Sequence, residues 1–485
     1  MRTWAIRAAA VVLAACAAWA GGCGGKDRAA DAGTSEADRA VRQRWGKGLE
    51  ELPTVTLVLI SAHNENILDE YERAFSLHHA VAYGQRVSID RREVGGGGSA
   101  IQRNLRNVYA EADTARIDVI WGGGDVVFGV LARPTERHPE GLLERLELAD
   151  DVLANVPEEL NGQRLIDARR RWIGSAVSGF GFLYNAEMLR RCRIEPPRLW
   201  QDLGEARFTD LVELADPGQS GSVTATYMTI VKSAKGWPEG WARLMGVLSN
   251  AKRFADAAGA AANAPLLGDA LVATTIDFYG LLRVAEAPGT LVYVSPAGQT
   301  SFSADPIGIL KNPPHRELAG RFVDFVMSAR GQALWALPVG AADGPVRTAL
   351  GRQPIRRDVY ERYAGEFLPS VANPYEAGAA MAGGGEMDQV NFGVLRRLVT
   401  AAAVDNVDGL RRARRAMNRL AADPRRAEDY RRAMADFAAL PANADTLEKT
   451  NSPALAPADA RALYRIDTGW REFFRAKYER IAATR

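Results

Sequence analysis

A strand, a loop of small residues and a helix follow one another three times within residues 55–132, and this repeat constrains the fold more than any other feature of the chain. Residues 55–60 form a continuous run of β-branched residues and leucine, which is typical of a strand that is covered on both faces. Residues 87–94 and 117–121 predict two more strands, each with a helix after it. Successive units of this kind form a parallel sheet with right-handed crossovers.

The loops after these strands predict a binding site. In parallel α/β sheets, ligands lie at the carboxyl ends of the strands, where the amino termini of helices point. The three glycines at 122–124 tolerate positive φ and leave N–H groups free to face a bound oxygen, while Asp125 begins the next helix. A tight turn with nothing bound is the alternative. The candidate ligand-binding residues on this edge are Ser61, His63, Asn64, Glu65, Gly98, Ser99, Gly122, Gly123, Gly124 and Asp125.

A second group of candidates lies further along the chain. Ser220, Gly221 and Ser222 precede a helical stretch, so two hydroxyls and several N–H groups would face a ligand from a helix amino terminus. Asp277 and Tyr279 follow a strand-like run and would present a carboxylate and a phenol to the same place. The alternatives are a capping turn for the two serines and a core aromatic for Tyr279.

Size, charge and motifs exclude several classes of protein. A chain of 485 residues predicts two or three domains. The formal net charge of +2 falls to about zero without Arg2 and Arg7, so it does not indicate a nucleic-acid partner. The glycine runs at 95–98 and 122–124 match neither a P-loop nor a dinucleotide fingerprint. No nucleophile elbow is present, and the five histidines have no zinc-ligand spacing.

The amino terminus has the pattern of an export signal. Residues 1–23 combine a basic start, an apolar stretch and small residues before Cys23, and the sequence around Cys23 resembles a bacterial lipobox. Cys16 is the alternative lipidation site, and secretion without a lipid is a third possibility. Residues 24–52 predict a flexible tether. Once Cys16 or Cys23 is lipidated or removed, at most one other cysteine remains beside Cys192, so a disulfide framework is not expected.

Several motifs in order resemble one protein family. They are Asp118-Val-Ile-Trp-Gly-Gly-Gly, Val177-Ser-Gly-Phe-Gly-Phe-Leu-Tyr-Asn, Ser303-Ala-Asp-Pro-Ile-Gly-Ile-Leu-Lys and Phe322-Val-Asp-Phe-Val-Met-Ser-Ala-Arg-Gly-Gln. The series resembles the extracellular solute-binding proteins of ABC importers. The resemblance is to the ferric-iron-type group, which also includes binders of phosphorylated and phosphonate solutes, and it covers residues 54–345.

The resemblance implies an α/β, two-lobed periplasmic-binding-protein fold of type II, in which each lobe is a mostly parallel sheet flanked by helices, with an α-helical C-terminal extension. The lobes close on a ligand as a hinged clamp. The implied division is residues 53–172 for the first part of lobe 1, 173–302 for lobe 2, 303–404 for a return to lobe 1 with a C-terminal wrap, and 405–485 for the extension. Residues 174–179 and 299–303 are the expected hinge strands.

The resemblance also implies a function: a membrane-anchored, non-enzymatic binding component that delivers its ligand to an ABC permease and its ATPase. Such a protein would be a monomer at the periplasmic or outer face of a bacterial membrane, with no cofactor and no nucleic acid. The arginine-rich residues 405–485 predict a solvated helix face or a docking surface for the permease.

The ligand implied by the resemblance is ferric iron or a small solute that carries phosphate or carboxylate. For iron, the donors would be His63, Glu65, Asp277 and Tyr279. Iron binders of this family often use a tyrosine pair, but this chain has Phe278 before Tyr279. A secreted enzyme or sensor domain that reuses the clamp is one alternative function, and a partner-binding lipoprotein with an empty cleft is another.

Overall fold

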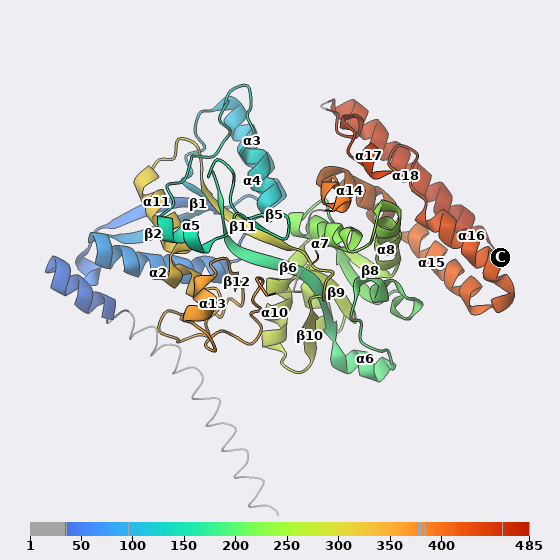
Figure 1. The fold of residues 1–485 in the computed structure, drawn as a ribbon, viewed down its shortest axis with the longest axis horizontal. Helices are drawn as coiled ribbons and strands as arrows, with labels where there is room; N and C mark the ends of the chain where they lie inside the picture. Colours follow the sequence, from blue (N-terminus) through green and yellow to red (C-terminus); the bar gives the residue numbers. More distant parts are fainter. Residues whose placement is uncertain are drawn as a thin grey trace, which may run out of the picture.

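The computed structural model describes residues 34, 36–95, 97–376, 381, 385–457 and 459–484, which form two α/β lobes that share one sheet (Figure 1). The strands run in the order β2-β1-β3-β11-β6-β9-β7-β8, and β10 and β12 also pair with β6. Their bounds are β1 Thr54–Ser61, β2 Arg86–Arg92, β3 Val119–Trp121, β6 Ile173–Asn185, β7 Val212–Ala215, β8 Ala251–Ala255, β9 Val272–Ile276, β10 Leu291–Val294, β11 Phe302–Ile309 and β12 Gln353–Pro354.

The first lobe contains the three predicted strand–loop–helix units. β1 is parallel to β2 and to β3, with Thr54 opposite Arg86 and Leu59 opposite Val119. The helices after these strands are α2 Glu65–Tyr83, α3 Gly98–Glu111 and α4 Asp125–Leu131. α11 Arg316–Met327 and α12 Ala329–Ala333 return to the same lobe. The apolar runs are buried on both faces of the sheet, as the β-branched sequences predict.

The second lobe repeats this plan with β7, β8 and β9, which are parallel to one another. Its helices are α6 Ala186–Cys192, α7 Gly221–Lys232, α8 Trp237–Ser249, α9 Ala258–Leu267 and α10 Asp277–Glu286. A separate apolar core holds these elements together, so each lobe has a core of its own.

One long strand crosses from one lobe to the other. β6 pairs with β11 and β12 in its first half and with β9 and β10 in its second half. Ile173, Ala176 and Val177 of β6 belong to the first core, whereas Phe180 and Phe182 belong to the second. β6 is therefore the strand that runs through both lobes, and the antiparallel β11 pairs with its first half.

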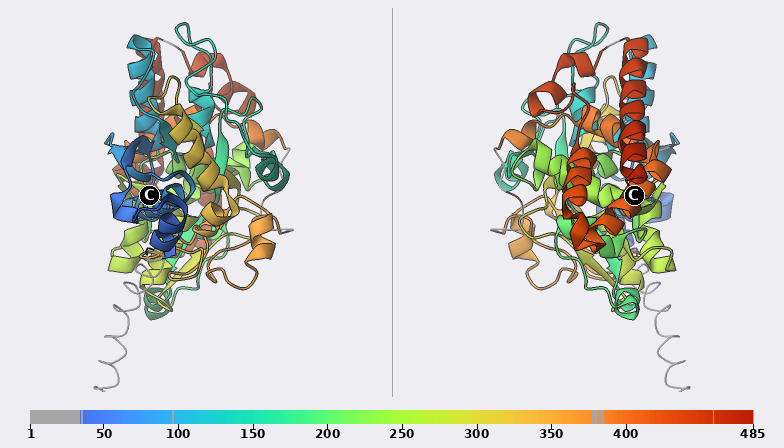
Figure 2. Two further views of the ribbon diagram at one scale, coloured as in Figure 1. Left: turned by 90° about the vertical axis from the view of Figure 1, so that its left-hand side faces the viewer. Right: turned by 90° about the vertical axis from the view of Figure 1, so that its right-hand side faces the viewer.

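The C-terminal helices pack on the second lobe. They are α14 Phe392–Val399, a π-helical turn at Thr400–Val404, α15 Val407–Ala422, α16 Ala427–Ala438, α17 Leu447–Thr450 and α18 Ala460–Ala483. The short α13 Asp358–Arg362 precedes them in the chain. α15 and α16 contact α8, and α14 contacts α7. α15 and α16 lie on the side of the second lobe that faces away from the first (Figures 1 and 2).

Two predicted segments need correction. The C-terminal part of residues 303–404 was expected to wrap the first lobe, but Val394, Leu395 and Leu398 of α14 belong to the second core. The apolar stripe of α14 predicts a buried face without indicating which lobe covers it. The tether expected at residues 24–52 is structured where it is described: residues 36–45 are helical, and Val41 and Leu49 pack with Ala80 of α2.

The predicted signal peptide and its candidate lipidation sites, Cys16 and Cys23, lie outside the described residues. Within the described part of the chain, no helix combines the length and the apolar character that crossing a membrane requires.

Candidate ligand-binding site

Two helix amino termini, one from each lobe, meet between the lobes. α3 begins at Gly98 and α7 at Gly221, and neither N-terminal cap forms a side-chain hydrogen bond to the first turn. A Cβ atom built on Gly221 would lie 3.8 Å from the carbonyl oxygen of Gly123 and 3.8 Å from Ser99 Oγ. Because both helices direct uncapped N–H groups and the positive end of their dipoles to this place, it suits an anion.

Three hydroxyls surround these amides. Ser220 Oγ and Ser222 Oγ lie 3.0 Å apart, and Ser99 is buried at the start of α3. Hydroxyls and amides together can surround a tetrahedral or planar oxyanion with donors, as in many phosphate sites. The structure thus brings together Gly98, Ser99, Ser220, Gly221 and Ser222 from the predicted set.

The triglycine loop does not have the expected free amides. Its three residues have φ of 76°, 104° and 88°, which glycine adopts without strain. Gly123 donates its N–H to Asp305 Oδ1 at 2.9 Å and Gly124 donates to the same oxygen at 3.3 Å, while Gly122 donates to the Pro306 carbonyl. A carboxylate of the protein itself therefore occupies the N–H groups that were predicted to bind the ligand. Asp125 accepts from its neighbour, the N–H of Val126, at 2.9 Å.

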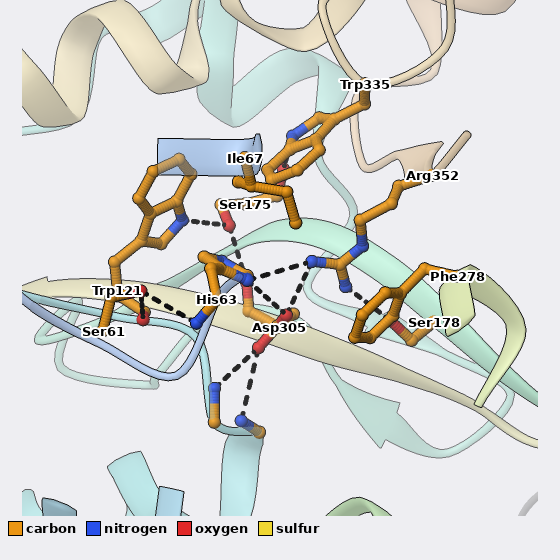
Figure 3. Close-up of polar contacts among 12 residues, drawn as sticks. Ser61, His63, Ile67, Trp121, Ser175, Ser178, Phe278, Asp305, Trp335 and Arg352 are labelled. Atoms are coloured by element: carbon orange, nitrogen blue, oxygen red, sulfur yellow. Dashed lines mark hydrogen bonds and ion pairs between the residues drawn. The ribbon is translucent and has the colours of Figure 1, made fainter. Parts of the chain in front are cut away.

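Asp305 belongs to a buried charged cluster between the lobes (Figure 3). Its Oδ2 pairs with a guanidinium nitrogen of Arg352 at 2.8 Å and lies 3.7 Å from His63 Nδ1. The same guanidinium nitrogen is 3.4 Å from His63 Nδ1, and its other terminal nitrogen donates to Ser178 Oγ at 2.6 Å. Since a guanidinium only donates, Nδ1 accepts and the proton of neutral His63 is on Nε2.

Aromatic rings enclose this cluster. The Arg352 Cζ atom lies 4.6 Å from the ring centre of Phe278 in the second lobe and 5.0 Å from that of Trp335 in the first. The His63 ring packs edge-on against Trp121 at 4.7 Å, and Trp121 Nε1 donates to Ser175 Oγ at 2.7 Å. The cluster is therefore largely shielded from solvent, which strengthens its electrostatic interactions.

The residues after β1 mainly shape their own loop. Ser61 Oγ donates to the Trp121 carbonyl at 2.8 Å and accepts from the N–H of His63 at 3.0 Å. Asn64 caps α2 by accepting from the N–H of Ile67 at 3.1 Å. Glu65 is exposed in the first turn of α2. These roles hold His63 in place, but they do not bring Ser61, Asn64 or Glu65 to the helix amino termini.

The four metal donors inferred for iron are not assembled. Asp277 is buried and accepts hydrogen bonds from the N–H groups of Gly179 and Phe278, so it ties α10 to β6. The ring of Tyr279 contacts that of Phe278 at a tilt of 39°, with ring centres 4.2 Å apart. Within the described ranges, no three His, Cys, Asp or Glu side chains are grouped to hold a metal ion. The structure does not group His63, Glu65 and Asp277 to hold a metal ion, so the role of these residues and Tyr279 in binding iron stays a prediction from the sequence.

The acid and base of the cluster have displaced pKa values. Burial lowers the pKa of His63 to about 4, with Asp305 opposing and Arg352 adding to the shift. Burial raises the pKa of Asp277 to about 6, against the Gly179 amide and Arg352. Burial also raises the pKa of Asp305, but Arg352 and then His63 outweigh it, so this pKa lies below its ordinary value.

These shifts predict a pH dependence of stability. Between pH 6.5 and 4, the folded state binds fewer protons at His63 than the unfolded state, so its contribution to stability is lost as the pH falls. Between pH 6 and 3.8, the folded state binds more protons at Asp277, so stability is gained as the pH falls. In Asp277→Asn, the unfolding free energy relative to the wild type should therefore fall by roughly 2 kcal/mol between pH 7 and 4.

Urea titrations at several pH values would measure this difference. His63→Gln is the matched control, because its stability relative to the wild type should change in the opposite direction. Parallel stability curves for Asp277→Asn and the wild type would contradict the assignment.

A separate hollow of about 630 Å³ lies on the first lobe. Its lining includes Arg145, Asp151, Arg170, Arg316 and Asp324, and it shares no residue with the loops between the lobes. Opposite charges already pair with one another at this hollow, as Arg316 does with Glu147 at 3.9 Å. We therefore place the candidate site at the helix amino termini, where the groups of both lobes converge.

Comparisons with known proteins agree with this architecture. The family model of the bacterial extracellular solute-binding proteins matches residues 137–346. The phosphoglycerate transport regulatory protein PgtC of Salmonella typhimurium is 26% identical over 164 residues, which are 34% of this chain and 40% of PgtC. A putative 2-aminoethylphosphonate-binding periplasmic protein of the same organism is 22% identical over 248 residues, covering 48% of this chain and 72% of the relative. The chain thus spans about 40% of the length of PgtC.

Solved structures show the same fold. AfuA from Actinobacillus pleuropneumoniae, with fructose-6-phosphate bound, has a TM-score of 0.52 and 18% identity over 66% of this chain and 88% of AfuA. Iron-bound HitA from Pseudomonas aeruginosa has a TM-score of 0.51 and 18% identity over 71% of this chain and 98% of HitA. The predicted two-lobed fold of type II periplasmic binding proteins is confirmed, and so is the resemblance to the family.

Proposed function

We propose that this chain, which resembles the bacterial extracellular solute-binding proteins, is the ligand-binding component of an ABC-type importer. In this proposal it binds a small organic anion between its lobes, performs no chemistry on it, and passes it to a permease that works with an ATPase. The observation that carries the proposal is the meeting of the two uncapped helix amino termini of α3 and α7, one from each lobe.

The chemistry of the site favours phosphate or carboxylate as the recognised group. Amides and hydroxyls at two helix starts stabilise negative charge, and Ser99, Ser220 and Ser222 add donors without adding a fixed negative charge. Among the similar proteins, PgtC, the aminoethylphosphonate-binding relative and AfuA are named for or contain phosphorus-bearing solutes, whereas HitA contains iron. The donor set of this chain matches the phosphorus-bearing group of ligands.

Opening of the clamp would admit the ligand. The Gly221 and Gly123 loops are already close to van der Waals contact, so a ligand enters between them only when the lobes move apart. The paired strands β6 and β11 are where this motion would be centred. Lipidation of Cys23, or of Cys16, would hold the protein at the periplasmic or outer face of the membrane, and it stays a prediction from the sequence.

A panel of solutes tests the proposal. Thermal unfolding of the wild type with 3-phosphoglycerate, fructose 6-phosphate, 2-aminoethylphosphonate, simple carboxylates and ferric nitrilotriacetate should show a higher Tm with at least one organic anion, because a ligand at about 100 times its Kd adds about 2.7 kcal/mol of stability. If no organic anion raised the Tm, the proposed function would be wrong.

The double substitution Ser220→Ala with Ser222→Ala should then weaken binding of that anion about 10- to 100-fold, since each hydroxyl supplies one hydrogen bond to a charged group. Isothermal titration calorimetry gives the affinities. Ser233→Ala, at the opposite end of α7, is the matched control and should bind like the wild type. Equal affinities of the double variant and this control would exclude the α7 terminus from the site.

A further inference from the structure

The guanidinium of Arg352 is completely buried where the two lobes meet, beside β6 and β11 (Figure 3). It contacts Asp305 of β11 at 2.8 Å, Ser178 of β6 at 2.6 Å and His63 after β1 at 3.4 Å. Arg352 immediately precedes β12, which pairs with β6, and its N–H donates to the Trp335 carbonyl at 2.8 Å. The backbone therefore fixes the position of this cation.

The groups around Arg352 are those that a hard metal ion prefers. A carboxylate, an imidazole and a hydroxyl contact it directly, and Asp277 and Tyr279 interact with its charge from slightly further away. Oxygen donors with one imidazole are suited to a trivalent ion such as ferric iron. In this protein the same groups surround a guanidinium.

The aromatic neighbours fit the guanidinium and cannot serve a metal. Phe278 and Trp335 lie on either side of it, at 4.6 and 5.0 Å, which are distances for cation–π contact. Neither ring offers a lone pair for coordination. Phe278 comes from the second lobe and Trp335 from the first, so the cation also joins the two lobes.

Asp305 and Arg352 already form a balanced ion pair. Asp305 supplies one negative charge, and Arg352 lies close enough to neutralise it. A buried charge is tolerated when it is paired, so removal of the guanidinium would leave the carboxylate in need of another cation. A ferric ion added beside Arg352 would instead meet a like charge a few ångströms away in a largely buried environment.

We propose that Arg352 is a resident cation in the place of a metal ion, and that it determines specificity by closing this cleft to ferric iron and leaving the helix amino termini to an organic anion. The claim that the helix amino termini bind an organic anion rests on the proposed function. The claim that Arg352 stands in the place of a metal ion concerns the cluster alone.

A gain of iron binding tests the proposal. Ferric nitrilotriacetate is titrated into the wild type, into Arg352→Gln with Phe278→Tyr, and into Arg352→Lys with Phe278→Tyr. The glutamine variant removes the cation and adds a phenol, so it should bind ferric iron at least about 100-fold more tightly than the wild type, with a visible phenolate-to-iron band. The lysine variant keeps a positive charge beside the same phenol and should stay colourless.

Circular dichroism and Tm establish that each variant is folded. Ferric binding by the wild type with a visible band would overturn the proposal, and this measurement does not depend on how the variants fold. A folded glutamine variant without iron binding, or equal binding by the lysine variant, would also overturn it.

The same proteins are titrated with the solute panel described above. Iron binding by the glutamine variant, together with no organic anion bound by the wild type, would support the resident cation and contradict the proposed function. If the wild type bound an organic anion and the folded glutamine variant bound no iron, the result would support the proposed function and contradict the resident cation.

Discussion

Replacing Arg352 by methionine is expected to lower the free energy of unfolding by about 3–5 kcal/mol, because Asp305 is then left as a buried carboxylate without its ion pair. The methionine fills much of the space between Phe278 and Trp335, so the loss should come mainly from charge and hydrogen bonding. Urea unfolding followed by circular dichroism at pH 7 measures the change.

Arg356→Met is the control for this substitution. Arg356 is also buried, but its partners Asp151 and Asp358 are partly exposed and can be hydrated when the arginine is removed. The free energy of unfolding lost in Arg356→Met should be less than half of that lost in Arg352→Met. If the two variants lost equal stability, the Asp305 pair would have no special contribution.

A double-mutant cycle separates the ion pair from other effects. Asp305→Asn removes the charge and leaves a carbonyl oxygen that can still accept from the N–H of Gly123. In the Arg352→Met background, this second change should recover part of the stability, with a coupling of at least about 1.5 kcal/mol between the two sites. Additive losses would show that Arg352 stabilises the cleft through packing alone.

Gly221→Leu should lower the affinity for the organic anion by at least about 100-fold, or about 2.7 kcal/mol, and leave the fold intact. Gly221 is the first residue of α7, and a Cβ atom there already lies 3.8 Å from the Gly123 carbonyl oxygen and from Ser99 Oγ. The further atoms of leucine would fill the space in which the two helix amino termini meet. Calorimetry with the anion identified from the panel measures the loss.

The fold should tolerate this change, because Gly221 does not have the positive φ that would make a side chain strained. Gly469→Leu, in α18, adds the same side chain at an open helix position with no atom within 4 Å of its Cβ. Both variants should unfold close to the wild-type Tm, and the Gly469 control should bind normally. Wild-type affinity in Gly221→Leu would mean that the ligand lies elsewhere.

Local patterns predicted the architecture because they depend on neighbours in the chain. The β-branched run of β1 and the amphipathic pattern of α3 follow from side-chain periodicity. Ser220 to Ser222 were placed correctly at the start of a helix facing the other lobe, since parallel strands direct the following helices to one edge.

The electrostatic interior of the cleft was not predictable in the same way. Asp305 was part of a recognised motif, but nothing near it indicates that its carboxylate would bind the Gly123 and Gly124 amides from more than 180 residues away. Arg352 stands in a segment with no motif, and its partners His63, Ser178 and Phe278 come from three other parts of the chain. A buried ion pair depends on which distant strands cross.

Periodicity and turn residues were therefore sufficient for the parallel strand–loop–helix units of the first lobe and for the small-residue loops, whereas the two-lobed fold was implied by the family resemblance. Tertiary packing decided which groups fill the space behind those loops, which lobe receives α14 to α18, and that residues 36–52 pack on α2 instead of forming a free tether. The physical reason is that an apolar stripe must be covered and a buried charge must be paired. Which residues do so depends on the chain path that brings distant segments together.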